Sequence, residues 1–250
     1  MVQDGRRWLK SPINSPEDLV ESDQQKGLEA PSIQKPYPSD AALVDLVAPE
    51  AFSLGDTSLV AALRERKSRR QYADSALTLD EFSFLLWAVQ GVRRVSEKVP
   101  VSFRTVPASG GIHPFETYLV INRVENLDPG LYRYLPVEHK LLRVGPVDPE
   151  WLEKLVFACR GQAFVRKSAV VFIWTAVPYR TEWRYANEAH KGIALSSGHV
   201  CQNLYLACEA IGAGTCAISA YAQDAMDSLL GVDGRDEFTV YIAPVGKVAE

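Results

Sequence analysis

The sequence has no long hydrophobic run and no hydrophobic leader, and each absence removes a class of protein. The longest apolar stretch covers residues 169–177, far short of the ~20 residues that a membrane-spanning helix needs. The first ten residues hold no apolar core and no small-residue cleavage site, so no secretory signal is predicted. We therefore expect a soluble protein of the cytoplasm that does not interact with membranes.

The sequence also has few cysteines, and they are not spaced as ligands or redox pairs. Cys159, Cys201, Cys208 and Cys216 form no C-x-x-C pair and show no zinc spacing, so no metal site is predicted. Cys201 and Cys208 lie seven residues apart, on one face of a predicted helix. The pattern indicates reduced, mostly buried thiols.

An excess of charge of one sign is absent too. The net charge of −4 creates no field that would attract nucleic acid or an anionic membrane. No G-x-G-x-x-G segment opens a βαβ unit, so no separate dinucleotide-binding domain is expected. A chain of 250 residues with 47% hydrophobic residues can bury a sizeable core, as one large domain or two small ones.

Residues 1–54 read as an extended N-terminal arm. Prolines interrupt this segment at positions 12, 16, 31, 36, 38 and 49, and helical or strand periodicity is poor. A few apolar residues, such as Trp8 and Leu43, favour an arm that lies across the body or across a partner subunit. Residues 55–250 are predicted to form the folded domain.

Periodicity and capping signals place helices and strands in the folded domain. Helices are expected from Ser58 to the basic cluster, from Thr78 to Gly91, and over residues 148–158, 185–211 and 224–230. Strands are expected at 116–124, 130–134, 140–144, 170–176, 215–219 and 237–245. Helices and strands do not alternate strictly, so the predicted class is α+β, with a central mixed sheet flanked by helices.

A basic segment, Arg66-Lys-Ser-Arg-Arg-Gln-Tyr72, follows the first of these helices. Guanidinium groups and a serine hydroxyl suit a dianionic phosphate, because they give charge-assisted donors of fixed geometry. The same composition also fits a solvated basic patch with no ligand.

A loop rich in glycine and proline, Val106-Pro-Ala-Ser-Gly-Gly-Ile-His-Pro-Phe115, precedes a predicted strand. Gly110 and Gly111 allow the backbone to approach a flat ligand closely, because neither has a Cβ. Pro107 and Pro114 stiffen the two ends of the turn. Taken alone, the loop also fits an ordinary loop-to-strand junction.

These two segments resemble motifs of the flavin-dependent nitroreductase superfamily. Three more segments agree in the same order: 198–207 (GHVCQNLYLA), 212–218 (GAGTCAI) and 244–247 (PVGK). The resemblance covers roughly residues 55–250. Within the superfamily, the sequence most resembles the SagB/ThcOx-type dehydrogenases, several of which oxidise azolines in modified peptides. It implies a nitroreductase-like α+β fold and an intertwined homodimer with one FMN site at each end of the interface.

The resemblance also implies which residues contact FMN. By this resemblance, Arg66, Lys67, Ser68 and Arg70 bind the phosphate. The ring lies against a loop made of Pro107, Ala108, Ser109, Gly110, Gly111 and His113. Backbone amides at Ala217, Ile218 or Ser219 are candidates to face the flavin N5. Gly246 and Lys247 match the terminal step of the family.

Two of these assignments depart from the family pattern. Gly111 stands where many relatives carry a ring-binding asparagine. Many relatives continue to a basic residue that touches phosphate, whereas this sequence ends at Glu250, so that contact is either absent or replaced by Lys247. His113 can donate to flavin or substrate, or it can be a histidine satisfied by the backbone. The 212–219 segment also fits a helix cap, at Gly212, followed by a buried strand.

Arg184 and Tyr185 stand where azoline dehydrogenases of this branch often show a Lys-Tyr pair, thought to act as acid and base. An arginine cannot lose its proton at usable pH, so Arg184 cannot replace a general-base lysine, although it can orient an anionic substrate. Tyr185 keeps a phenol that can donate a proton, or it simply packs at the start of a helix.

The implied activity is an FMN-dependent oxidoreductase working by ping-pong hydride transfer from NAD(P)H to a small electron-poor acceptor. A SagB-like dehydrogenase that oxidises an azoline-containing peptide, or another small substrate, is the alternative enzyme. A non-catalytic flavin-binding module is the alternative of another class.

Overall fold

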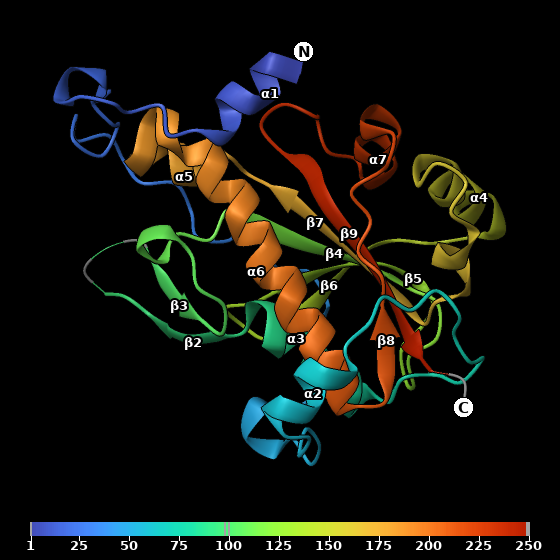
Figure 1. The fold of residues 1–250 in the computed structure, drawn as a ribbon. Coiled ribbons are helices and arrows are strands. Elements are labelled where there is room, and N and C mark those ends of the chain that lie inside the picture. Colours follow the sequence, from blue (N-terminus) through green and yellow to red (C-terminus); the bar gives the residue numbers. More distant parts are fainter. Residues whose placement is uncertain (1, 98, 100, 249–250) are drawn as a thin grey trace.

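The computed structural model describes residues 2–97, 99 and 101–248, and its architecture confirms the α+β class (Figure 1). Its seven-stranded sheet has the order β1-β6-β5-β4-β7-β9-β8. The strands are β1 Leu43–Asp45, β4 Phe115–Ile121, β5 Gly130–Leu135, β6 Lys140–Gly145, β7 Val170–Ala176, β8 Ala213–Thr215 and β9 Phe238–Lys247. A separate hairpin pairs β2 (Val92–Val95) with β3 (Ser102–Arg104).

The sheet is antiparallel, where the sequence predicted a mixed one. All strand ladders among the described residues run antiparallel, and parallel pairing is limited to the isolated bridges Ser68–Thr215 and Leu77–Val124. Short turns join β4 to β5 and β5 to β6, and such turns can only join antiparallel neighbours.

Helices cover both faces of this sheet (Figure 1). The helices of the structure are α1 Val2–Leu9, α2 Leu59–Glu65, α3 Leu79–Gln90, α4 Pro149–Ala158, α5 Tyr179–Tyr185, α6 Ala189–Ala210 and α7 Gln223–Leu230, of which α3 and α6 pack on one face of the sheet and α4 and α7 on the other. The three helices begin where the sequence predicted: Ser58 caps α2, Thr78 and Glu81 form the capping box of α3, and Asp148 caps α4. Among the described residues, no helix has the length and apolar character to cross a membrane.

Strand β7 divides the core into two clusters. Its alternate residues Phe172 and Trp174 pack with α3 and α6 on one face, whereas Val171 and Ile173 pack with α4 and α7 on the other. Side chains of successive strand residues point to opposite faces, so a strand buried on both faces is apolar throughout, as the sequence predicted. The four cysteines are buried and unpaired, also as predicted.

Of the element boundaries that differ from the prediction, two lie next to the candidate site. The helix expected from Tyr185 to Ile211 is interrupted: α5 ends at Tyr185, a 3-10 turn covers Ala186–Glu188, and α6 begins at Ala189. Ala186 has φ 43° and ψ −122°, which a regular helix cannot include. The strand expected at 215–219 begins earlier, because Gly212 turns with φ 63° and Ala213 pairs at once with Lys247.

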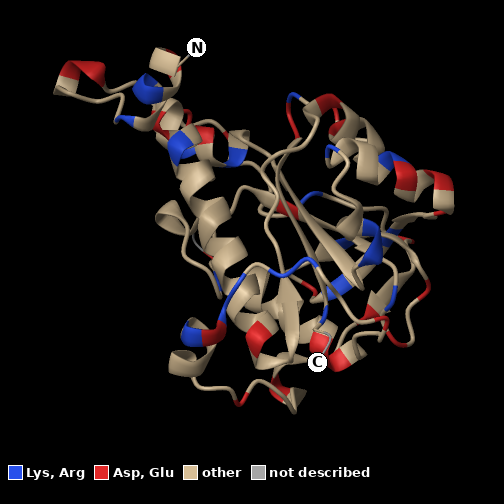
Figure 2. Ribbon diagram, turned by 45° about the vertical axis from the view of Figure 1, so that its right-hand side comes forward, with Lys and Arg blue, Asp and Glu red and all other residues tan. Residues whose placement is uncertain are grey.

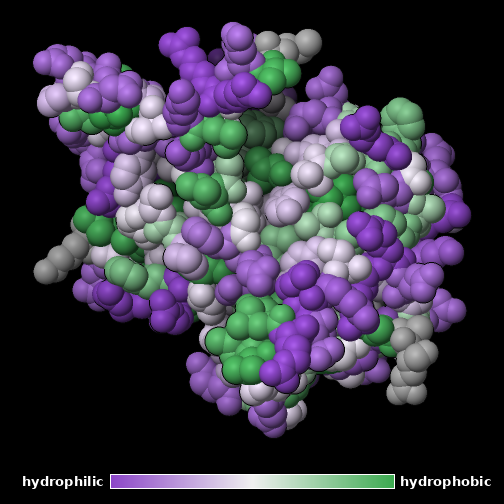
Figure 3. Space-filling view, viewed as in Figure 1, coloured by the Kyte–Doolittle hydropathy of each residue, from purple (hydrophilic) through white to green (hydrophobic). Residues whose placement is uncertain are grey.

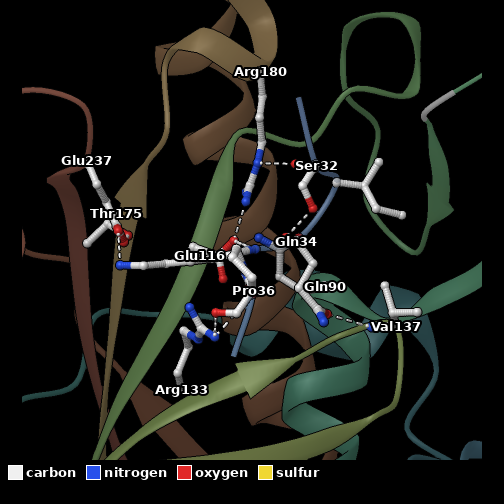
Figure 4. Close-up of polar contacts among 12 residues, drawn as sticks. Ser32, Gln34, Pro36, Gln90, Glu116, Arg133, Val137, Thr175, Arg180 and Glu237 are labelled. Carbon is white, nitrogen blue, oxygen red and sulfur yellow. Dashed lines mark hydrogen bonds and ion pairs between the residues drawn. The ribbon is translucent and has the colours of Figure 1, made fainter. Parts of the chain in front are cut away.

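The N-terminal segment crosses the body of its own chain and carries short elements. Strand β1 pairs with β6 at the edge of the sheet. Figure 4 shows the crossing: Arg180 donates to the carbonyl of Ser32 at 2.8 Å, and Glu116 accepts both from Arg180, at 2.6 Å, and from the backbone N–H of Lys35, at 2.8 Å. Buried polar contacts therefore hold the arm in place.

Candidate functional site

The basic segment leaves α2 in an extended conformation beside β8 (Figure 2). The N–H of Arg69 donates to the carbonyl of Thr215 at 2.9 Å. The Arg69 side chain turns inward: a Cβ on Gly214 would lie 2.4 Å from its Cδ, and its guanidinium lies 3.7 Å from the Glu209 carboxylate. Side chains alternate in extended backbone, so Ser68 and Arg70 turn away from Arg69.

Lys67, Ser68 and Arg70 line a cleft of about 400 Å³, together with Arg69, Gln71 and Val248. Lys67 and Arg70 are exposed and form no ion pair with any residue that the structure describes. The Arg70 guanidinium lies 5.9 Å from the centre of the Phe164 ring. Two unpaired cations beside a hydroxyl form a suitable site for a phosphate-like oxyanion.

Arg66 occupies a different position from the other three predicted phosphate ligands. It is half-buried and lies over the Tyr205 ring, with its guanidinium carbon 5.3 Å from the ring centre. It is not among the residues that line the cleft. Arg66 therefore contacts Tyr205 and adds positive charge near the cleft without lining it.

Tyr205 connects two of the predicted segments and was not singled out from the sequence. Its hydroxyl lies 2.9 Å from Ser68 Oγ and accepts the N–H of Ala217 at 2.9 Å. The Tyr205 side chain is 9% exposed, whereas Ser68 lies at the surface. Tyr205 lies within the 198–207 motif, and its polar hydroxyl next to the apolar stripe of α6 was the available signal.

The three amides proposed to face a flavin are not equivalent. The N–H of Ala217 is engaged by Tyr205, and that of Ile218 donates to the Ile242 carbonyl at 2.7 Å. Within the described part of the chain, the N–H of Ser219 has no acceptor. Ser219 is therefore the best placed of the three to donate to a ligand.

The terminal Gly246-Lys247 step packs against the site and does not line the cleft. A Cβ on Gly246 would lie 2.8 Å from Tyr72 Cβ, so only glycine allows the basic segment to sit this close. The Lys247 ammonium donates to Glu81 Oε1 at 2.5 Å and to the Ile211 carbonyl at 2.7 Å. Lys247 is thus paired with the first turn of α3, which favours the alternative that the phosphate contact of the relatives is absent here.

The glycine loop forms a 3-10 turn, Ser109–Gly111, that requires its glycines. Gly110 has φ 60° and Gly111 has φ 73°, in the left-handed region that other residues rarely adopt. The N–H of Gly111 donates to the Ala108 carbonyl at 3.1 Å, which closes the turn. Pro107, Ser109 and Gly110 are exposed, as a loop that contacts a ligand would be.

The fold brings the glycine loop against Arg184 and Tyr185. A Cβ on Gly110 would lie 2.4 Å from Tyr185 Oη and 3.1 Å from Arg184 Nη1. The positive φ of Ala186 ends α5 directly after this pair, and backbone strain in a non-glycine residue tends to occur where function constrains it. Two separately predicted sets thus form one cluster.

His113 lies inside the protein and not at the loop surface. It is 6% exposed and lies next to Ser102 in the lining of a small internal cavity. Burial, reinforced by the Arg104 guanidinium, lowers the pKa of His113 to about 3. The imidazole is neutral at physiological pH, so the structure favours the backbone-satisfied histidine over a proton donor to flavin or substrate.

The cleft and the glycine loop contact opposite ends of α6. Ser109 Oγ lies 3.6 Å from the position of a Cβ on Gly192, whereas Ser68 contacts Tyr205. Thirteen residues separate these helix positions, which corresponds to about 20 Å along the axis. One chain therefore places its two predicted cofactor segments well apart.

Comparison with known proteins assigns this arrangement to a family. Residues 63–247 match the sequence model of the Nitroreductase family. A protein of Methanocaldococcus jannaschii named as nitroreductase MJ1384 is 32% identical over 188 residues, covering 75% of this chain and 90% of the relative.

Solved structures agree at the level of the fold. One named as a nitroreductase of Ralstonia eutropha has a TM-score of 0.66 at 24% identity, covering 89% of this chain and 100% of that chain. An NADPH:FMN oxidoreductase of Vibrio harveyi, solved with NAD⁺, has a TM-score of 0.53 at 15% identity, covering 76% and 69%. The SagB/ThcOx branch stays a prediction, but on the family match and its relative the chain belongs to the nitroreductase family, which points to an oxidoreductase.

Proposed function

We propose that this protein is an FMN-dependent oxidoreductase that uses NAD(P)H to reduce a small electron-poor acceptor. The cleft formed by Lys67, Ser68 and Arg70 supports the proposal most strongly, because Lys67 and Arg70 are exposed and have no acidic partner among the described residues. A surface patch with no ligand needs neither this convergence nor the hydroxyl between the cations.

The residues present suit FMN. Lys67, Ser68 and Arg70 would hold the phosphate, with Arg66 adding positive charge from above Tyr205. The Ser219 amide would donate to the ring edge of the cofactor. When bound, FMN supplies a ring that one substrate reduces and a second re-oxidises, while the protein supplies binding and orientation.

Arg184 and Tyr185 are the proposed substrate-contacting pair. The Tyr185 hydroxyl and the Arg184 guanidinium both lie against Gly110, at the surface of the loop proposed to face the cofactor ring. Arg184 remains protonated, so its role would be to orient an anionic group. The phenol of Tyr185 would donate the proton that a reduced acceptor needs.

A homodimer would bring these parts into a single site. The cleft and the glycine loop of one chain lie about 20 Å apart along α6, so we propose that the loop of each chain serves the cofactor of its partner. An apolar patch over α2, next to the basic segment, supports this arrangement (Figure 3): Leu59, Val60 and Leu63 are 63%, 63% and 54% exposed.

The test is an anaerobic absorption spectrum of the FMN-loaded protein before and after addition of NADH or NADPH. Bleaching of the flavin bands, followed by their recovery with a nitroaromatic acceptor, is the expected result. Bands that persist would favour a dehydrogenase with another electron donor, or a flavin-binding module. Failure to bind FMN at all would contradict the proposal at its first step.

A further inference from the structure

Tyr205 lies at the centre of a hydrogen-bonded path between two segments that are far apart in the sequence. Its hydroxyl joins Ser68 Oγ, which lines the cleft, to the backbone N–H of Ala217, each at 2.9 Å. The three residues come from the basic segment, from α6 and from the turn after β8. None of these contacts is needed to build the strands or helices themselves.

The chemistry of the groups allows all hydrogen bonds of the path to run in one direction, although either hydroxyl can donate in the Ser68–Tyr205 bond. A backbone N–H can only donate, so the Tyr205 oxygen accepts from Ala217. A phenol carries one proton, and Ser68 Oγ is the polar atom within reach of it. When Ser68 accepts that proton, its own hydroxyl proton is free to point into the cleft, towards an anion bound between Lys67 and Arg70.

An oxyanion in the cleft would fix this direction and strengthen it. The anion attracts the Ser68 proton, and successive hydrogen bonds in one direction polarise each other. Arg66 lies over the Tyr205 ring at 5.3 Å, and a cation there makes the phenol a better donor. Occupation of the cleft is thereby communicated to the backbone that leads to Ser219.

We propose that Tyr205 is a positioning residue that aims the Ser68 hydroxyl at a phosphate group and couples occupation of the cleft to the backbone at Ala217–Ser219. The inference rests on the proposed FMN function and goes beyond it, because it names a residue that touches neither the phosphate nor the ring. It also explains why a tyrosine, and not a phenylalanine, occupies this buried position of α6.

The affinity test compares FMN with riboflavin, which lacks the phosphate. We expect Tyr205→Phe to weaken FMN binding about tenfold, as for loss of one hydrogen bond to a charged group, and to change riboflavin binding much less. Ser68→Ala should give a similar selective loss, and the double variant should lose little more, because both residues act through one path. Tyr132→Phe is the matched control, since it also removes a hydroxyl that donates at 2.9 Å, there to the Asp128 carbonyl.

The coupling itself has a readout that needs no turnover. In an amide NMR spectrum of the cofactor-free protein, titration with inorganic phosphate should shift the Ala217 resonance, and Ser68→Ala should abolish that shift. Ser68 is exposed, so this variant keeps the test available even where Tyr205→Phe fails to fold.

Equal weakening of FMN and riboflavin by Tyr205→Phe, additive losses in the double variant, or an Ala217 resonance unmoved by phosphate would overturn the inference. The proposed function fails separately: FMN that binds with the expected selectivity but is not reduced by NADH or NADPH would leave the role of Tyr205 intact.

Discussion

Arginine and lysine cluster in two regions of the molecule. In one region these side chains are paired with carboxylates, and in the other they are exposed. Where the arm crosses the body, Arg180 and Glu116 pair at 2.6 Å while only 5% and 2% exposed, and Lys35 pairs with Glu237 (Figure 4). In the cleft beside α2, Lys67 and Arg70 are exposed and have no acidic partner among the described residues. Basic residues therefore indicate a ligand here only where the fold leaves them unpaired.

The largest expected effect comes from breaking the buried pair. Arg180→Ala leaves the Glu116 carboxylate buried without its partner, so the free energy of unfolding should fall by about 3–5 kcal/mol. Urea denaturation measures the change. Lys154→Ala, which removes an exposed pair with Glu150, should leave the free energy of unfolding nearly unchanged and serves as the control. Similar costs for the two variants would remove the distinction between the regions.

The opposite pattern is expected in the cleft. Arg70→Ala should weaken FMN binding by about 1.5–3 kcal/mol, because it removes a charge-assisted partner of the phosphate, while thermal stability changes little. Arg66→Ala should act in the same direction and less strongly, since Arg66 does not line the cleft. Fluorescence titration gives the affinities, with the exposed Arg235→Ala as control. Unchanged affinity in both Arg70→Ala and Arg66→Ala would contradict the phosphate assignment.

The buried His113 should make the free energy of unfolding depend on pH. Its pKa is about 3 in the folded protein and about 6.5 when unfolded, so the unfolded chain binds the proton more readily. The contribution of neutral His113 to the free energy of unfolding is fully present above pH 6.5 and should fall by about 1.4 kcal/mol for each pH unit below it, until the folded pKa is reached. Urea denaturation at pH 7 and pH 5 measures this slope. His113→Gln should flatten it; an unchanged slope would mean that other groups dominate.

The smallest of the expected effects comes from a substitution of Lys247. Lys247→Met should leave FMN affinity unchanged and lower the free energy of unfolding by about 1 kcal/mol, because its ammonium is paired with Glu81 and not with the cleft. Parallel FMN titration and thermal denaturation separate the two effects. A loss of affinity as large as that of Arg70→Ala would restore Lys247 to the phosphate site.

Local signals in the sequence predicted much of the fold. A capping box needs only Thr78 and Glu81, three residues apart, and the structure contains it. The buried strand β7 follows from a continuous apolar run. The interruption of the helix at Ala186 was missed, because an alanine carries no signal for a positive φ.

The candidate site could be predicted only in part, because several of its contacts join residues that are distant in the sequence. The Lys67, Ser68 and Arg70 positions could be read from one short segment, but their exposure could not. The pairing of Lys247 with Glu81 spans 166 residues, and the Tyr205 contacts join three elements. Such pairings depend on the packed fold, and no spacing rule encodes them.

The most direct test of the central claim is a crystal structure of the protein grown with FMN. We expect the FMN phosphate to lie within hydrogen-bonding distance, about 3 Å, of Ser68 Oγ and of the Lys67 or Arg70 side chain. A phosphate bound elsewhere, with Lys67, Ser68 and Arg70 facing only solvent, would contradict it.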